Sequence, residues 1–359
     1  MELQTLINNY SDYLSIFKEN NLKCKFFKKK YCLVTYKYEE GLTYHNENNY
    51  WKMYCRGAVI DIINHKVVCV PPVKADEIKS IEEISNVENL NNRDIEYQSL
   101  IDGTMINLWY HNEQWNLSTR SDIGGYNKWD QKLSFKDMFE QCCQFNYELL
   151  DKQLCYSFVM RHISNRNISP ICMNETYIVE VVDMTTYNRL RVEEYPNFLL
   201  VNDNLNEEVI YNNYENNEVP YYYKGYTIKI GNKRYKYINP EFIKERKIKE
   251  NKNNVYLRYL ELRQLGLIQQ YIDIFPEHNY LFKKYKQELH KLSNDLFTTY
   301  KQKNIYKQDI QLSYSLKPLL TDIHNIYKQN MKPITWNDIK NYIYNLPPKK
   351  LLFALNYHN

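Results

Sequence analysis

The hydrophobic pattern of this chain changes near Pro240 from mainly strand-like to helical spacing, and that change restricts the folds that the chain can adopt. From about residue 20 to residue 240, much of the sequence alternates apolar and polar residues or forms short β-branched runs, which predicts strands. Beyond Pro240, Leu, Ile and Tyr recur every three or four positions among Lys and Gln through 254–303 and 308–346, which predicts helices. We therefore expect an α+β body over residues 1–245 and an all-helical domain over residues 246–359.

Local signals place several elements within the body. CRGAVIDIINHKVVCVPP and INLWYHNEQWNLSTR each have two apolar arms around a short turn, at 64–66 and 111–113, and both predict β-hairpins. Helical spacing covers 2–20 and returns over 134–150, where Ser134 and Asp137 form a capping pattern. Further strands are predicted at CYSFVMRH, TYIVEVVDM, PYYYKGYTIKI and RYKYI, with a turn at 231–232, whereas the Asn-rich stretch 202–219 predicts a surface loop.

Charge is divided unevenly between the two regions. The formal net charge is only +4, yet 20 Lys and Arg stand against 11 Asp and Glu from Glu241 onward, and 27 against 32 before it. A basic helical region suits an anionic partner such as a nucleic acid, whose phosphates would meet Lys and whose bases would meet Tyr in KKYKQELHKL and YKQKNIYKQ. Lysines that only solvate helix surfaces explain the charge equally well, and we expect most of these tyrosines in the core.

The eight cysteines all lie in the first half, without a C-x-x-C pair or a histidine at zinc-finger spacing. Most sit in apolar runs and no signal-peptide pattern precedes them, so we expect buried free thiols in a reducing, cytoplasmic compartment. No apolar run approaches the roughly 20 residues of a membrane span, so no membrane partner is expected. Heavy use of Tyr, Asn, Ile and Lys, whose codons are A/T-rich, indicates an A/T-rich genome such as that of a virus, which would place the protein in host cytoplasm or the virion.

Short sequence blocks in the first 245 residues follow one another in a fixed order. They are Arg56-Gly57, P-P-V-Lys74, L-I-Asp102-Gly103, S-T-Arg120, F-V-M-R-H-I-S-N-R-N from Phe158, Lys224-G-Y-T and Lys236-Y-I-N-P-E-F. In this order the chain resembles the ATP-dependent RNA ligases of the phage RNA ligase 1 type, which belong to the covalent nucleotidyltransferase superfamily. The resemblance implies a nucleotidyltransferase domain of ATP-grasp-like antiparallel sheets flanked by helices.

The resemblance also shows what is missing for catalysis. In that family a lysine two residues before the Asp-Gly turn attacks the α-phosphate of ATP, and AMP then passes to an RNA 5′-phosphate. Leu100 occupies this position, and a hydrocarbon side chain has no lone pair to donate. Val159 replaces a carboxylate that binds the ribose, Lys224 replaces a glutamate that helps to place the metal, and Ile238 replaces a second lysine. We therefore predict no catalytic residue and no metal site.

The blocks that remain predict binding of phosphate. A site lined by several cations attracts phosphates, and Phe158 could lie against a base. The predicted nucleotide- and phosphate-binding residues are Arg56, Lys74, Asp102, Gly103, Arg120, Phe158, Arg166, Lys224 and Lys236. The expected partner is nucleic acid, RNA rather than DNA, with no required cofactor and with ATP at most bound without turnover.

Other interpretations stay open at this stage. Arg56, Arg120 and Arg166 could form structural ion pairs with Asp61, Asp122 or Glu180, and His162 is expected to be a core histidine rather than a base. As a whole, the chain could be a degenerate RNA ligase-like binding module. Alternatively, it is an active ligase or adenylyltransferase that uses a displaced lysine, namely Lys74, Lys224 or Lys236. The third hypothesis is a structural protein that assembles with protein partners in a viral complex.

Overall fold

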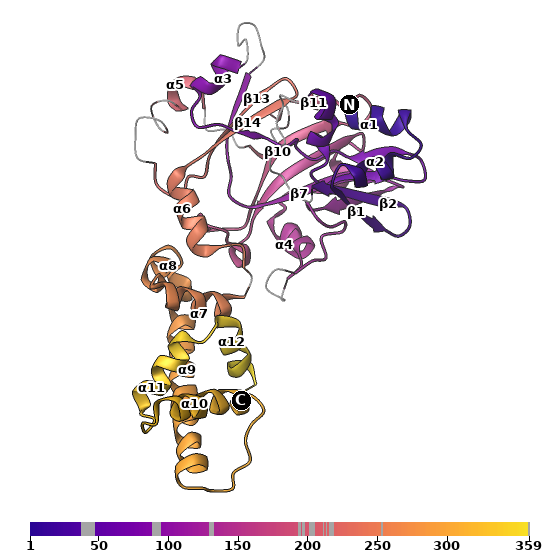
Figure 1. The fold of residues 1–359 in the computed structure, drawn as a ribbon. Coiled ribbons are helices and arrows are strands. Elements are labelled where there is room, and N and C mark those ends of the chain that lie inside the picture. Colours follow the sequence, from indigo (N-terminus) through magenta and orange to yellow (C-terminus); the bar gives the residue numbers. More distant parts are fainter. Residues whose placement is uncertain are drawn as a thin grey trace. The chain divides into compact units, whose positions relative to one another are not determined.

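The computed structural model describes residues 1–359 apart from 37–46, 88–94, 129–132, 193–194, 196–197, 201–204, 211, 213, 215–218, 253 and 358–359. The described residues form two compact units, Met1–Lys244 and Glu245–Asn359 (Figure 1). The first unit mixes largely antiparallel sheets with helices, and the described part of the second contains helices. The expected α+β class with a helical C-terminal region is therefore confirmed.

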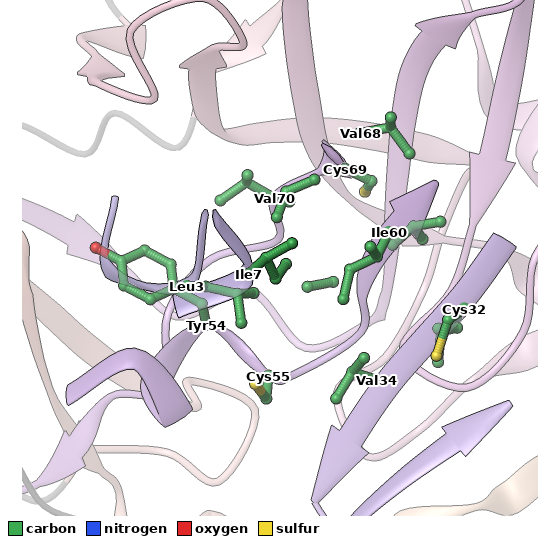
Figure 2. Close-up of a cluster of buried hydrophobic side chains, with 14 of the residues drawn as sticks. Leu3, Ile7, Cys32, Val34, Tyr54, Cys55, Ile60, Val68, Cys69 and Val70 are labelled. Carbon is green, nitrogen blue, oxygen red and sulfur yellow. The ribbon is translucent and has the colours of Figure 1, made fainter. Parts of the chain in front are cut away.

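The first sheet is antiparallel in the order β1-β2-β3-β4 and carries two helices on its core face. Figure 2 shows how Leu3 and Ile7 on the first helix join Ile60 of the sheet and Val70, which follows β4, in one apolar cluster. Burying these side chains stabilises the unit by about 25 cal/mol for each Å² of apolar surface removed from water. The elements are α1 (Glu2–Asn9), α2 (Tyr13–Glu19), β1 (Leu22–Phe27), β2 (Tyr31–Tyr36), η1 (Glu47–Tyr54), β3 (Ala58–Asp61) and β4 (Lys66–Cys69).

The central sheet has the order β11-β10-β9-β7-β8, with β12 added in parallel to β10. One face is covered by α4, whose Phe139 packs on Phe158 of β9 with the ring centroids 5.7 Å apart. The elements are β7 (Thr104–His111), β8 (Gln114–Ser118), α4 (Phe135–Cys142), η2 (Tyr147–Leu149), β9 (Leu154–Arg161), η3 (Ile163–Asn165), β10 (Glu175–Asp183), β11 (Arg189–Leu190) and β12 (Leu199–Leu200).

The third sheet has the order β5-β14-β13-β6. One of its faces packs on α3 and α5 through a cluster that contains Tyr226, Ile228 and Tyr235. Because strand side chains alternate, residues 227, 229, 234 and 236 point to the opposite face, toward the central sheet. The elements are β5 (Asp76–Glu77), α3 (Glu82–Val87), β6 (Ile95–Ser99), α5 (Glu207–Ile210), β13 (Gly225–Ile230) and β14 (Lys233–Ile238).

Most of the local predictions are confirmed. Both hairpins form with their turns at the expected residues, where His65, Asn112 and Glu113 have positive φ. Ser134 and Asp137 make the predicted reciprocal cap, although α4 ends at residue 142, earlier than predicted. Residues 2–20 form two helices, and the segment before Gly225 is not part of β13. Half of the predicted loop 202–219 lies outside the described residues, and its described part contains the short helix α5, which the sequence did not predict.

The second unit consists of helices joined by short connections. Its longest helix, α9, runs for 22 residues and buries Phe282, Leu289, Leu292 and Leu296 along one side. The helices are α6 (Pro240–Lys249), which begins in the first unit, α7 (Val255–Leu265), α8 (Ile268–Ile274), η6 (Pro276–His278), α9 (Asn279–Tyr300), the π-helical turn η7 (Lys301–Ile305), α10 (Leu316–Asn330), α11 (Trp336–Asn345) and α12 (Pro348–Asn356). None of the helices that the structure describes has the length and apolar character needed to cross a bilayer. All eight cysteines are free thiols, and five of them are buried.

Candidate functional site

The Asp-Gly turn stands at the start of β7 and anchors the loop after β9. Asp102 is buried, and its Oδ2 accepts hydrogen bonds from the backbone N–H groups of Ile168 (2.8 Å) and Ser169 (3.0 Å). Gly103 is required by close packing, since a Cβ there would lie 2.4 Å from the carbonyl oxygen of Met160 on β9. The two residues that the sequence assigned to the site therefore hold its framework together.

Leu100 lies at the end of β6, where its backbone N–H donates to the carbonyl of Gly225 on β13 (2.9 Å). Lys224 brings an amine to the Asp-Gly turn. Its Nζ lies 3.4 Å from the carbonyl oxygen of Ile101 and 3.6 Å from Oδ1 of Asp102. The ammonium also lies 5.7 Å from the ring centroid of Phe242, a cation–π contact. Lys224 thus places a positive charge beside the Asp-Gly turn.

Three further cations gather at this end of the third sheet, and we call Arg56, Lys74 and Lys236 the cationic cluster. Burial lowers the pKa of Lys236, and the charges of Arg56 and Lys74 lower it further, while Glu77 opposes the change from 3.3 Å away. Lys74 has its own carboxylate neighbour, Asp76, at 3.7 Å. The parallel pairing of β5 with β14 brings these two acids beside the cluster. Positive charges are therefore held close together despite their mutual repulsion.

Arg120 reaches the same region from the end of the β7–β8 hairpin. Gly57 has φ +108°, and a Cβ there would lie 3.1 Å from Cα of Arg120, so the two segments are in close backbone contact. Both Arg56 and Arg120 act on Tyr36: burial raises the pKa of its hydroxyl, and the two guanidinium groups oppose that rise. The fold thus brings residues 56 and 120 to one place.

Arg166 belongs to the loop that Asp102 anchors. Its Nε and Nη2 atoms both donate to the carbonyl of Ile168, at 3.3 and 3.0 Å. The preceding Asn165 is buried and donates to Oγ1 of Thr104 on β7 (2.8 Å). Thr104, which follows the Asp-Gly turn, therefore orients Asn165, and Asp102 orients Arg166 through Ile168.

The prediction that Phe158 lies against a base is wrong. Its side chain is fully buried and packs between Phe145 and Phe198, with ring centroids 5.3 and 5.5 Å away. It lies on the core face of β9, under α4, and Val159 occupies the opposite face. The alternation of a strand fixes that these two neighbours point apart, but the sequence does not reveal which of them faces the third sheet.

Between the central and third sheets lies a buried charged network that the sequence did not point to. Lys229, which is 1% exposed, contacts Oε1 of Glu96 (2.8 Å) and donates to the carbonyl of Val179 on β10 (2.9 Å). Arg234 binds Glu180 of β10 at 3.2 Å. These contacts join the two sheets, so the chain's own side chains fill this part of the space between them.

The pKa values in the network follow from burial. Burial lowers the pKa of Lys229 to about 8, with a further lowering by Arg234 that Glu96 opposes. Burial alone would raise the pKa of Glu96, but Lys229 and Arg189 hold it below its usual value. A lysine at an inward position of an otherwise apolar strand, as in GYTIKI, is the sequence signal that could have revealed this network.

His162 is buried between Gln141 Oε1, 2.9 Å from its Nε2, and the N–H of Ser164, so it is a core histidine as expected.

The acids proposed as structural partners of the arginines have other neighbours. The carboxylates bind other cations: Asp61 lies beside Lys30 and His111, Asp122 binds Lys25, and Glu180 binds Arg234.

The residues at this end of the sheet do not suit a magnesium ion. The ammonium of Lys224 lies 3.6 Å from Oδ1 of Asp102, and an ammonium has no lone pair with which to ligate a metal. Among the residues that the structure describes, no group of three or more His, Cys, Asp and Glu side chains could hold a metal ion. The arrangement can attract and orient an anion through fixed positive charges.

Comparison with known proteins places this chain near a viral protein and near nucleic-acid ligases. No protein-family model matches it. An immediate-early protein ICP-46 homolog of Invertebrate iridescent virus 3 is 24% identical over 319 residues, which cover 78% of this chain and 70% of that protein. Among solved structures, a putative ATP-dependent DNA ligase from Aquifex aeolicus has a TM-score of 0.45 and 13% identity, and the match covers 80% of this chain and 81% of that one.

Two RNA ligases are also among the similar structures. An archaeal ATP-dependent RNA ligase has a TM-score of 0.43 and 11% identity over 77% of this chain and 70% of its own. Naegleria gruberi RNA ligase with PPi has a TM-score of 0.35 and 13% identity, and the match covers 51% of this chain and 60% of that ligase. With TM-scores below 0.5, these similarities transfer neither binding nor catalysis to this chain. The match to the phage RNA ligase 1 type stays a prediction.

Proposed function

We propose that the first unit is a ligase-like binding module for nucleic acid or nucleotide that does not transfer adenylate. One observation carries this proposal: Lys74 and Lys236 lie together where β5 pairs with β14, and Arg56 is near enough for its charge to act on Lys236. Cations grouped in this way attract an anionic ligand such as phosphate, although Asp76 and Glu77 offset part of their charge. Lys224 adds a further cation beside the Asp-Gly turn.

The absence of adenylyl transfer is proposed on chemical grounds. Formation of a lysine–AMP bond needs an amine at the position of Leu100, and the ligase pattern needs a carboxylate where Lys224 stands. The cavity between the sheets farther along β13, which Lys229, Arg234 and Glu180 line, has a volume of about 30 Å³ and is too small for a nucleotide, so we place the nucleotide at the cationic end. ATP would bind there through its phosphates and remain intact.

Exposed aromatic side chains beside Lys224 support a polymer as the ligand. Tyr222 and Tyr223 are 47% and 51% exposed, with their ring centroids 4.9 Å apart. The carbonyl of Tyr222 accepts a hydrogen bond from Oγ of Ser169, which places the backbone of Tyr222 beside the loop that Asp102 anchors. Bases stack on such rings with little dependence on sequence while phosphates bind nearby cations. In this role Tyr222 and Tyr223 take the place that the sequence gave to Phe158.

RNA is the polymer that we propose, because the order of the blocks resembles that of RNA ligases. A viral source, and with it the host cytoplasm or the virion, is part of the same proposal and is supported by the viral relative. Neither part depends on the other. The two can therefore be tested separately.

Binding is tested by fluorescence anisotropy with labelled single-stranded RNA, single-stranded DNA and ATP at several salt concentrations. We expect RNA binding that weakens with salt, because phosphate contacts release counterions. The double variant Arg56→Ala/Lys236→Ala should bind more weakly and reduce the salt slope by about 2, roughly 1 for each phosphate contact. The matched control removes two exposed lysines of α2 and β1, Lys18→Ala/Lys23→Ala. Equal loss in both variants, or no salt-sensitive binding of any ligand, would refute the proposal.

An active adenylyltransferase with a displaced lysine is the second candidate, and the position of Lys224 favours it. Its amine lies 3.4 Å from the carbonyl of Ile101, next to the missing nucleophile. Incubation with α-labelled ATP and Mg²⁺ separates the two candidates, because only the active protein becomes covalently labelled. We expect no label on the wild type or on Leu100→Lys. Label on the wild type that is lost in Lys224→Arg would establish the second candidate.

A further inference from the structure

A groove runs across the helical unit between α7, α8, α9 and α11, and it has a volume of about 540 Å³. Its floor is apolar and is formed by side chains from all four helices. This volume lies within the roughly 300–1,000 Å³ of protein sites that bind a ligand or an anchoring side chain. The floor residues are Tyr259, Ile268, Ile272, Phe282, Leu289 and Ile343.

The rim of the groove carries positive charge only. Arg263, Lys283, Lys286 and Lys340 line it, and no Asp or Glu is among the lining residues. In the part of the chain that the structure describes, the three lysines have no carboxylate within ion-pair distance, whereas the neighbouring Lys284 has Glu288. An apolar floor between unpaired cations is complementary to an apolar surface that is flanked by carboxylates.

Trp336 supplies an aromatic anchor at one end of the groove. Its Nε1 donates to Oδ1 of Asn294 (2.8 Å), and the ammonium of Lys340 lies 5.8 Å from its ring centroid. Arg263 is held at the α11 end, where it donates to the carbonyls of Ile343 (3.0 Å) and Tyr344 (3.1 Å). Both side chains are thus fixed before a ligand arrives, which reduces the entropy lost on binding.

We propose that this groove binds an amphipathic helix of a protein partner, with its apolar face on the floor and its Asp and Glu residues against Lys283, Lys286 and Lys340. A helix presents apolar side chains at positions i, i+3, i+4 and i+7, which suits a groove between helices. Tyr344, which is 45% exposed, offers a nucleic acid a stacking ring at the edge of the groove, but the floor, where Phe282 is 4% exposed, offers no ring face to a base and suits apolar side chains better. This inference does not rest on the function proposed for the first unit.

The test displays helical peptides of about 16 residues with randomised surface positions and selects them on the full-length protein. Enriched peptides should carry apolar residues at i, i+3, i+4 and i+7 and a net negative charge. In anisotropy measurements they should bind Lys283→Glu/Lys286→Glu at least tenfold more weakly than the wild type. The matched control, Lys317→Glu/Lys328→Glu, reverses two exposed charges on α10 outside the groove and should bind as the wild type does.

Three outcomes overturn the proposal. They are the absence of enriched peptides, enrichment of basic peptides, and affinities that change equally in both double variants. An oligouridylate of about 12 nucleotides serves as the competing ligand. If Lys283→Glu/Lys286→Glu loses affinity for it at least tenfold while the peptides are unaffected, the groove is a nucleic-acid site instead. Circular dichroism of both variants shows whether the helices remain folded, and both pairs are exposed, so we expect unchanged spectra.

Discussion

The substitution Lys229→Met tests the charged network between the central and third sheets. Methionine has a similar length and no charge, so it can occupy the space of Lys229 while the ammonium and its contacts with Glu96 and Val179 are lost. Glu96 keeps Arg189 as an ion-pair partner. The variant therefore removes the titration of one buried amine and leaves no carboxylate without a cation.

The pH dependence follows from the pKa of this amine. Burial lowers the pKa of Lys229 from 10.5 to about 8, so the folded state disfavours the charged form. The free energy of unfolding is therefore reduced by the full amount below about pH 8. This reduction disappears as the pH rises toward 10.5, because in that range the unfolded chain binds the proton of Lys229 more tightly than the folded chain does. From about pH 7 to about pH 9.5, the wild type should gain about 2 kcal/mol in the free energy of unfolding relative to Lys229→Met.

Urea unfolding followed by tryptophan fluorescence measures this difference. Both proteins carry Trp336→Phe, so that the signal comes from the first unit, where Trp51 and Trp109 are buried. Titration of the tyrosines affects both proteins alike and cancels in the comparison. Lys23→Met, at an exposed position of β1, serves as the control and should keep the pH profile of the wild type. Parallel profiles for the wild type and Lys229→Met would refute the reasoning.

Three further predictions concern stability. Gly225→Ala should lower the free energy of unfolding by more than about 2 kcal/mol, because φ is +135° and a Cβ would lie 2.1 Å from a backbone carbonyl of β14. The control Gly231→Ala, at φ +56° with nothing within 4 Å of the added Cβ, should lower it by about 1 kcal/mol. Equal losses for the two variants in urea unfolding would contradict this reasoning. Ser134→Ala removes the reciprocal cap with Asp137 and should cost about 1 kcal/mol, measured in the same way; an unchanged midpoint would show that the cap contributes nothing. Phe158→Ala should cost about 3–5 kcal/mol, as for a core residue, while the remaining folded protein keeps its RNA affinity in anisotropy; a specific loss of affinity would restore Phe158 to the site.

Agreement between sequence and structure is best where the interacting residues are close along the chain. The hairpin turns at 64–66 and 111–113 and the cap of α4 depend on groups a few residues apart, so the local pattern specifies them. The helical spacing over 2–20 was confirmed, but it did not specify that the chain turns at residues 10–12, so that two helices, α1 and α2, form and both pack on the first sheet. Periodicity reports which residues are apolar and does not fix where a helix bends.

By itself, the sequence determined the type of each region, the order of the short blocks and the presence of a hydrocarbon side chain at Leu100. Only the tertiary structure decided which cations meet, because Arg56 and Lys236 are 180 positions apart and come together through sheet pairing. It also decided that Phe158 enters the core while Lys229 enters the space between the sheets. Alternation along a strand places each side chain on one of two faces of the sheet. Which face is the core is decided only when another layer packs against it.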